Sequence, residues 1–193
     1  MYQYWDETNF SYPAYLKAQV DLNKRKINWC WATAMDIKYI ANLVHGKGIC
    51  HGARNGFEVR EFEKYGNKVI GTDISDTAPD YGLIQWDFHH TNKKWLEKFD
   101  FVYTNSLDHS HTPSWAVRRF MEQLKPGGKC VIHTPDLFAN LQHNNPGDCF
   151  GATVEEMKEL LGPCEFYEFA NKHIYVVTKF TSSESSPSNL YCF

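Results

Sequence analysis

The sequence predicts an α/β fold whose sheet is mostly parallel and doubly wound, with helices on both faces and an antiparallel hairpin at its C-terminal end. Short apolar segments typical of strands alternate with segments of helical period over most of the chain, an order that favours a parallel sheet. A glycine-containing turn, Gly52–Gly56, lies between the first strand of this series and a helix. Two adjacent strand-like segments, 164–169 and 173–180, end the series and predict the hairpin.

Length and composition favour a single domain with a substantial core. The chain has 193 residues, of which 42% are hydrophobic and 16% aromatic, enough for one compact unit. No apolar segment approaches the roughly 20 residues of a membrane helix, and the first residues lack the pattern of a secretion signal. A net charge of -3 gives no reason to expect a nucleic-acid partner. We therefore expect a cytoplasmic protein without a membrane contact.

The cysteines agree with that compartment. There are six, scattered along the chain and without a Cys-x-x-Cys pair: Cys30, Cys50, Cys130, Cys149, Cys164 and Cys192. We expect free thiols in a reducing environment.

The N-terminal part is expected to be an accessory to the main domain. Residues 1–23 are aromatic and polar without a clear period, as in an arm laid over the core. Residues 24–44 carry apolar side chains at intervals of three and four, which predicts one helix ending at His45-Gly46. We divide the chain into an arm and helix (1–45), a main domain (46–180) and a Ser-rich flexible tail (181–193).

The main domain reads as strands and helices in alternation. Strands are predicted from short runs of apolar and β-branched residues, and helices from apolar positions three or four apart. In chain order the elements are strand 48–50, helix 55–65, strand 68–73, strand 83–86, helix 91–98, strand 99–104, helix 113–124, strand 129–133, helix 153–161 and the hairpin. The last helix begins with a capping box, Thr153-Val-Glu-Glu156.

The spacing of two features points to a nucleotide-containing ligand. Gly52 and Asp73 are 21 positions apart, close to the roughly 20 between a nucleotide-binding glycine turn and a ribose-binding carboxylate. Ligands of such sheets bind at the carboxyl ends of the strands. The loops after Cys50, Asp73, Trp86 and Thr104, and the one after His133, are the candidates, and an adenosine-containing cofactor is the leading hypothesis.

Four segments, in this order, resemble the class I S-adenosylmethionine-dependent methyltransferases, over roughly residues 49–180. They are Cys50-His-Gly-Ala-Arg-Asn-Gly56, Gly71-Thr-Asp-Ile74, Gln85-Trp-Asp-Phe88, and Phe99-Asp-Phe-Val-Tyr-Thr-Asn-Ser-Leu-Asp-His109 followed by Leu124-Lys-Pro-Gly-Gly-Lys129. The resemblance implies a Rossmann-like fold, S-adenosyl-L-methionine as cofactor and methyl transfer as the activity.

The resemblance also implies roles for particular residues. Asp73 is expected to accept hydrogen bonds from the ribose diol, and Asp87 with Phe88 to hold the adenine. Asn105 is expected to touch cofactor or substrate. Asp108 and His109 stand where many relatives have Glu-His, a pair that can be structural, and His109 could also act as a general base because histidine titrates near neutral pH. Asn105 and His109 are therefore the candidate catalytic residues. The expected cofactor-binding set is His51, Gly52, Ala53, Arg54, Gly56, Asp73, Ile74, Asp87, Phe88 and Asn105.

The glycine turn departs from the family pattern at two positions. Cys50 stands where the family has Asp or Glu, and Arg54 where it has the middle glycine. Arg54 and Glu58 are four positions apart, a spacing that permits a salt bridge on a helix. Arg54 could instead meet the carboxylate of the cofactor. The sequence leaves both interpretations open.

Other functions remain as alternatives. Asp108, His109, His111, His133 and Asp136 could converge on a metal, but the Asp-Asn pair of metal-dependent catechol-type enzymes is missing, and we expect no metal. A nicotinamide-dependent oxidoreductase would use the same glycine turn and Asp73, but a Tyr-x-x-x-Lys pair is absent.

The hypothesis that the protein is a catalytically silent relative of these enzymes is supported only by Cys50.

The acceptor is expected to be a small molecule, bound between the N-terminal arm and loop 135–151, because the chain contains little beyond the minimal domain.

Overall fold

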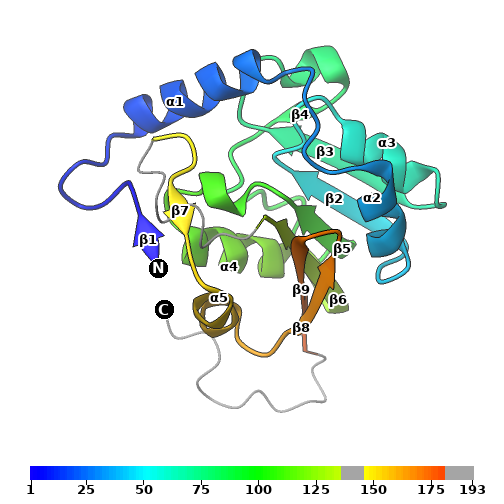
Figure 1. Ribbon diagram of the computed structural model, residues 1–193. Coiled ribbons are helices and arrows are strands. Elements are labelled where there is room, and N and C mark those ends of the chain that lie inside the picture. The colour runs from blue at the N-terminus through cyan, green and yellow to red at the C-terminus, as the bar shows by residue number, and fades with distance from the viewer. Residues whose placement is uncertain (136–145, 181–193) are drawn as a thin grey trace.

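A twisted sheet of seven strands forms the centre of the protein, in a computed structural model that describes residues 1–135 and 146–180 (Figure 1). In spatial order the strands are β4 (Ile84–Gln85), β3 (Lys68–Asp73), β2 (Lys47–His51), β5 (Phe99–Thr104), β6 (Leu124–Thr134), β9 (Lys172–Thr178) and β8 (Glu165–Phe169). The first five run parallel, while β9 and β8 are antiparallel to their neighbours. The predicted mostly parallel sheet with a C-terminal hairpin is confirmed.

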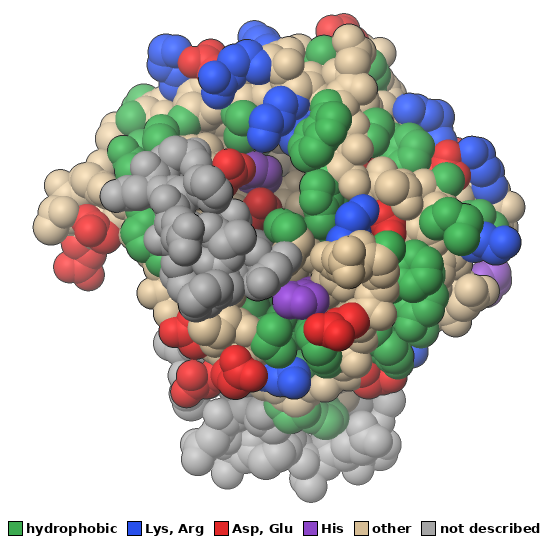
Figure 2. All heavy atoms as spheres, viewed as in Figure 1, with side chains coloured by type: hydrophobic (Ala, Val, Ile, Leu, Met, Phe, Trp, Pro, Cys, Tyr) green, Lys and Arg blue, Asp and Glu red, His purple; other side chains and the backbone are tan. Residues whose placement is uncertain are grey.

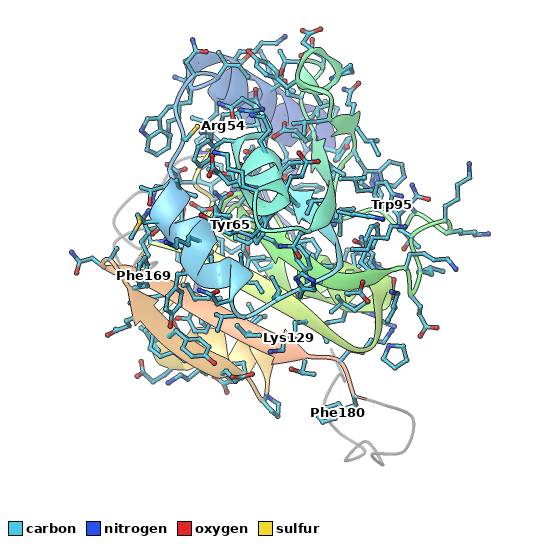
Figure 3. All side chains as sticks on the ribbon, turned by 90° about the vertical axis from the view of Figure 1, so that its right-hand side faces the viewer. Arg54, Tyr65, Trp95, Lys129, Phe169 and Phe180 are labelled. Carbon is cyan, nitrogen blue, oxygen red and sulfur yellow. The ribbon has the colours of Figure 1, made fainter. Side chains whose placement is uncertain are left out.

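Helices cover both faces of this sheet (Figure 1), as predicted. Helices α2 (Ala34–Ala41) and α3 (Phe57–Glu63) pack on one face, over a core that includes Phe62 and Phe101. Helices α4 (Pro113–Gln123) and α5 (Val154–Leu161) pack on the other, over a core that includes Phe120. On the first face, the ring of Phe169 in β8, labelled in Figure 3, stacks on Tyr39 of α2 with 4.5 Å between the ring centroids.

The chain order reverses at the centre of the sheet. From β2 the chain moves outward through β3 to β4, and then returns to place β5 on the other side of β2. The carboxyl ends of β2 and β5 therefore flank a topological switch point, where ligands of open α/β sheets bind.

The N-terminal 23 residues are more ordered than the expected irregular arm. Strand β1 (Tyr2–Gln3) pairs antiparallel with β7 (Phe150–Gly151), and a 14-residue helix, α1 (Tyr12–Arg25), follows it. Ser11 precedes this helix in extended conformation and Pro13 lies in its first turn, a common start signal. Helix α1 lies across the end of the sheet at which β2 and β3 finish (Figure 1).

The single helix expected over residues 24–44 is wrong. Helix α1 ends at Arg25, residues 26–33 form no helix, and α2 begins after Thr33. Thr33 and Asp36 form a reciprocal capping box, in which the Thr33 hydroxyl accepts from Asp36 N at 3.2 Å and the Asp36 carboxylate accepts from Thr33 N at 2.7 Å. Such a box satisfies amide donors that only a helix start leaves open.

Most other elements agree with the predictions. Strands 68–73 and 99–104 have the expected bounds, and the remaining strands and helices of the main domain differ at their ends. The helix expected over 91–98 is wrong, because only turns occur there: Trp95 N donates to Asn92 O, and Glu97 adopts φ 54°. Two short 3₁₀ turns, Ala78–Tyr81 and Leu107–His109, complete the described elements.

Three further expectations concern the whole chain. In the part that the structure describes, no helix is long and apolar enough to cross a membrane. The five described cysteines are free thiols. The expected flexible tail 181–193, Cys192 and the metal-ligand candidate Asp136 lie outside the described residues.

Strand β2 requires a glycine at its second position. A Cβ on Gly48 would collide with the ring of Phe101, which is fully buried on the neighbouring strand. We expect Gly48→Ala to lower the free energy of unfolding by about 1–3 kcal/mol, the usual cost of overpacking a core. Urea denaturation measures the change. Lys68→Ala, at the exposed first residue of β3, is the control, and equal stability of the two variants would contradict this packing argument.

Candidate cofactor site

The turn after β2 is held by backbone geometry that few residues permit. Gly52, Arg54 and Gly56 all have positive φ, at 69°, 45° and 72°. A Cβ on Gly52 would collide with the side chain of Ser106, which follows β5. The backbone of the turn therefore approaches the β5 loop as closely as glycine allows, and it exposes its main chain to the space above the sheet.

Asp73, at the end of β3, connects three segments of the chain. Its Oδ2 accepts from Arg54 N of the turn at 2.9 Å, and its Oδ1 accepts from Ser75 N at 2.9 Å and from Asn23 Nδ2 of α1 at 2.9 Å. The side chain is buried, and that burial raises its pKa against the opposing effect of these hydrogen bonds. Asp73 thus fixes the turn beside the carboxyl end of β3.

Asp87 lies next to it, in a buried chain of hydrogen bonds. His89 Nδ1 donates to Asp87 Oδ1 at 2.7 Å, and His89 Nε2 is 2.7 Å from Ser110 Oγ. Burial acts to raise the pKa of Asp87, but the hydrogen bonds and charge of His89 outweigh it and lower that pKa to about 2. The order Asp, His, Ser is that of a hydrolytic triad, yet Ser110 is fully buried, so its hydroxyl cannot reach a substrate.

Two adjoining cavities open at the switch point. The larger, of about 200 Å³, is bounded by the turn, by the β5 loop, by Glu58 of α3, and by residues between α1 and α2 that include Trp29 and Trp31. The smaller, of about 40 Å³, is bounded by α1, Asp73 and Phe88. Gly52, Arg54, Ser106 and His109 line both, so the cavities are two parts of one site. Figure 2 shows acidic and histidine side chains around a hollow on this face.

Eight of the residues expected in the site line these cavities: Gly52, Arg54, Asp73, Ile74, Asp87, Phe88, Asn105 and His109. Three others do not. Ala53 is packed in the core, Gly56 is the N-cap of α3, and the ring of His51 points to the opposite face, where it stacks on Phe120. Any part that residue 51 plays in binding therefore comes from its backbone.

Arg54 does not form the salt bridge with Glu58 that the sequence allowed as one of two interpretations. Its Nη1 donates to Trp29 O at 3.1 Å, and its guanidinium lies 5.6 Å from the centre of the Trp29 ring. Figure 3 shows Arg54 at the end of the molecule where α1 lies. Contact with an indole face and a carbonyl fixes the guanidinium at the rim of both cavities, so its charge remains available to a ligand.

Asn105 and Glu58 form a pair instead. Asn105 Nδ2 donates to Glu58 Oε1 at 2.9 Å, and both side chains line the larger cavity. Glu58 is only 6% exposed, and this burial raises the pKa of its carboxyl group. The first turn of α3 thus brings an acid into the site.

His109 lies between two carboxylates at the junction of the cavities. Its Nδ1 donates to Gly147 O at 3.0 Å, and its ring nitrogens are 3.8 Å from Asp108 Oδ1 and 3.4 Å from Asp148 Oδ1. A proton on Nδ1 leaves the lone pair of Nε2 free in the neutral ring, as a general base requires.

Those residues suggested for a metal that the structure describes, namely Asp108, His109, His111 and His133, do not converge on one point. Ligand atoms of Asp108, His109 and Asp148 lie within 4.8 Å of one another, as do those of Asp87, His89 and His111. His133 is elsewhere, with its Nδ1 2.9 Å from the hydroxyl of Tyr103.

Sequence reasoning missed the residues that α1 and the following loop bring to the site. Tyr15, Gln19, Leu22 and Asn23 line the smaller cavity, and Lys26, Trp29, Cys30 and Trp31 line the larger. Tyr12 donates from its hydroxyl to Asp87 Oδ2 at 3.0 Å. Helix α1 therefore covers both candidate nucleoside-binding acids.

Comparison with known proteins agrees with this geometry. Residues 49–132 match a family model described as a methyltransferase domain. A comparison with curated proteins gives no match.

Solved structures share the fold at low sequence identity. The Burkholderia thailandensis 1,6-didemethyltoxoflavin N1-methyltransferase, solved with its substrate and S-adenosylhomocysteine, has a TM-score of 0.68 and 14% identity, over 91% of this chain and 93% of its own. The Bradyrhizobium japonicum N-methyltransferase NodS has a TM-score of 0.65 and 11% identity, over 84% and 98%. A chain from a complex of the Haloferax volcanii Trm112 methyltransferase activator has a TM-score of 0.66 and 13% identity, over 90% and 100%.

The domain match and the fold define the class I S-adenosylmethionine-dependent methyltransferases, and this chain carries a domain of that class. Its cofactor is S-adenosyl-L-methionine, as the sequence predicted.

The buried ring of His51 predicts a measurable acid sensitivity. Burial lowers the pKa of His51 to about 4, below the value of about 6.5 in an unfolded chain. Between pH 6.5 and 4 the unfolded state therefore binds a proton that the folded state does not. As the pH decreases over this range, this group lowers the free energy of unfolding by up to about 3 kcal/mol. We expect His51→Gln to lose less stability than the wild type over this range in urea titrations.

The matched control is His45→Gln, at an exposed position. It should keep the wild-type dependence on pH. If the free energy of unfolding of His51→Gln depends on pH as steeply as that of the wild type, the His51 ring has the same pKa in the folded and unfolded states, which contradicts the prediction.

Proposed function

We propose that this enzyme transfers the methyl group of S-adenosylmethionine to a small-molecule acceptor, bound beside His109. The observation that carries the proposal is the meeting of the glycine turn, Asp73 and His109 at two continuous cavities. We further propose that residues 1–45 act with the main domain (46–180) as a cover over the cofactor.

The adenosine half of the cofactor fits the smaller cavity by chemistry. Asp73 offers two carboxylate oxygens to a ribose diol, and Asp87 offers an acceptor beside the ring of Phe88, which suits an adenine with its exocyclic amine. At about 40 Å³ this cavity is smaller than a nucleoside, so α1 must move outward when the nucleoside binds. Asn23 and Tyr12 would exchange their hydrogen bonds with Asp73 and Asp87 for bonds with the ligand or with water.

In methyl transfer the protein mainly positions the cofactor and the acceptor and excludes water from them. When bound, the cofactor supplies an electrophilic methyl group for in-line displacement. His109 holds its Nδ1 proton on Gly147 O, and we propose that Nε2 takes the proton of an acceptor that must lose one. Asn105 remains bound to Glu58 and acts through that contact.

The size of the site supports a small acceptor. The larger cavity is bounded by Trp29 and Trp31 on one side and by the β5 loop on the other, and its volume is about 200 Å³. The Burkholderia enzyme was solved with the small molecule 1,6-didemethyltoxoflavin.

Ligand titration and methyl transfer test the proposal together. Thermal-shift titration should show stabilisation by S-adenosylhomocysteine and none by NAD. Transfer of a radiolabelled methyl group should then be screened over small metabolites, with protein and nucleic acid as further acceptors. Stabilisation by NAD alone would favour the oxidoreductase alternative, and a labelled polymer would overturn the small-molecule acceptor.

Replacing the acid of β3 should weaken cofactor binding. We expect Asp73→Asn to raise the dissociation constant of S-adenosylhomocysteine about tenfold or more, because a hydrogen bond to a charged group contributes about 1.5–3 kcal/mol. Calorimetric titration measures the change. Asp76→Asn, on an exposed side chain that pairs with Lys24, should bind normally, and unchanged affinity of the Asp73 variant would remove that carboxylate from the site.

A further inference from the structure

Two carboxylates flank His109 in the larger cavity, away from the glycine turn. Asp108 belongs to the short 3₁₀ turn after β5, and Asp148 precedes β7. All three residues line the cavity. The ring nitrogens of His109 are 3.8 Å from Asp108 Oδ1 and 3.4 Å from Asp148 Oδ1. This part of the cavity therefore holds two acids around one base.

Asp108 lacks the partners that a buried carboxylate needs. The residue is 9% exposed, and its Oδ1 accepts no hydrogen bond from the residues that the structure describes. Burial raises the pKa of Asp108 and the charge of Asp148 adds to this effect, while the charges of His109 and Lys26 oppose it. A carboxylate withdrawn from water is costly unless a cation or several hydrogen bonds replace the solvent. A cation bound here would stabilise both acids.

The two cationic side chains that line the cavity are gathered on Trp29. The guanidinium of Arg54 lies 5.6 Å from the centre of the Trp29 ring, and Lys26 Nζ lies 5.3 Å from it. Within the described part of the chain, the charged partner of Asp108 is His109 and neither of these cations. Arg54 and Lys26 therefore do not pair with the acid beside His109.

The spacing of the three side chains matches one ammonium group. A ligand atom from each of Asp108, His109 and Asp148 lies within 4.8 Å of the other two. One nitrogen can therefore lie no more than about 2.8 Å from all three atoms, which is the length of a charge-assisted hydrogen bond. A primary ammonium has three N–H donors, which two carboxylates and a neutral imidazole nitrogen can accept.

We propose that the methyl acceptor is an amine, which enters in its ammonium form and is held by Asp108 and Asp148 beside His109. The inference rests on the proposed function, because it names the substrate class of the acceptor bound there. An anionic acceptor group would meet two like charges at the same point, so the site discriminates against it.

Proton transfer to His109 makes the acceptor nitrogen reactive. An ammonium has no lone pair, so His109 Nε2 takes one of its protons. The nitrogen lone pair then forms a bond to the methyl carbon while the carbon–sulfur bond breaks and leaves its electron pair on sulfur. The product is again an ammonium ion, and His109 releases its proton to water. Until then, the imidazolium lies beside two carboxylates, whose opposite charge stabilises it.

The chemical class of the labelled product gives the first test. Products of the radiolabelled metabolite screen are separated by cation exchange at neutral pH and then treated with base. Labelled amines should be retained by the column and should keep their label in base. Label found only in esters, ethers or other uncharged or anionic products would overturn the amine acceptor and leave the proposed methyl transfer intact. The absence of any labelled small molecule would instead refute the proposed function.

Isosteric substitutions test the two carboxylates. We expect Asp108→Asn and Asp148→Asn each to raise the KM of the amine that the screen identifies about tenfold or more, as for a lost charge-assisted hydrogen bond. The alcohol with the same carbon skeleton, tested as an inhibitor, should bind the wild type at least about tenfold more weakly than the amine. Both variants should lose most of that preference, with the dissociation constant of S-adenosylhomocysteine changed less than about threefold.

Asp76→Asn is the control, because this exposed acid pairs with Lys24 and lines neither cavity. It should keep the wild-type preference for the amine. Equal weakening of amine and alcohol by the Asp108 and Asp148 variants would assign a structural role to these acids and overturn the proposal. If neither variant folds, as seen in thermal unfolding, the wild type decides: equal affinity for amine and alcohol overturns it.

A divalent metal is the competing occupant, because carboxylates and imidazole are also metal ligands. Methyl transfer by the wild type should be unchanged in EDTA. Loss of transfer in EDTA would assign the carboxylates to a metal and overturn the ammonium contact.

Discussion

The site depends on the hydrogen bonds that the carboxylate of Asp73 accepts from the glycine turn and from α1. It accepts the backbone N–H of Arg54, and so it fixes a residue that holds an unfavourable positive φ. The same carboxylate accepts from Asn23, and so it also fixes the helix that covers the sheet end. One buried charge thus determines the shape of the turn and the position of its cover. Both depend in turn on the close approach of Gly52 to Ser106, which a side chain at residue 52 would prevent.

Around this centre, the charges of the turn differ from those expected for its family. An acid is missing at Cys50 and a cation is present at Arg54, and the sequence allowed either an internal salt bridge or a ligand contact. The geometry excludes the salt bridge, because Arg54 is bound by Trp29. Glu58 and Arg54 line the same cavity, Glu58 bound by Asn105 and Arg54 bound by Trp29. The negative charge of the cavity therefore comes from residues outside the two departures, since Glu58, Asp108 and Asp148 line it together with Arg54.

The sequence predicted the strands of the sheet more accurately than helix α1, which covers the end of the sheet, and the reason is physical. Strands 68–73 and 99–104 each contain three consecutive apolar residues or glycines, Val69–Gly71 and Phe101–Tyr103, because both faces of a parallel sheet are buried. Helix α1 buries Tyr15, Gln19, Leu22 and Asn23, and two of these are polar because they bond to other parts of the site. A search for apolar residues at helical spacing misses such a face. The break before α2 was readable, since Thr33 and Asp36 have the spacing of a capping box.

The polar face of α1 also explains why the cover and the ligand must compete. Asn23 and Tyr12 satisfy Asp73 and Asp87, which are the acceptors proposed for ribose and adenine. Without these bonds, two buried carboxylates would lose solvent with less compensation. With them, a nucleoside must displace the side chains or share the oxygens, and only the difference between the two sets of hydrogen bonds contributes to affinity.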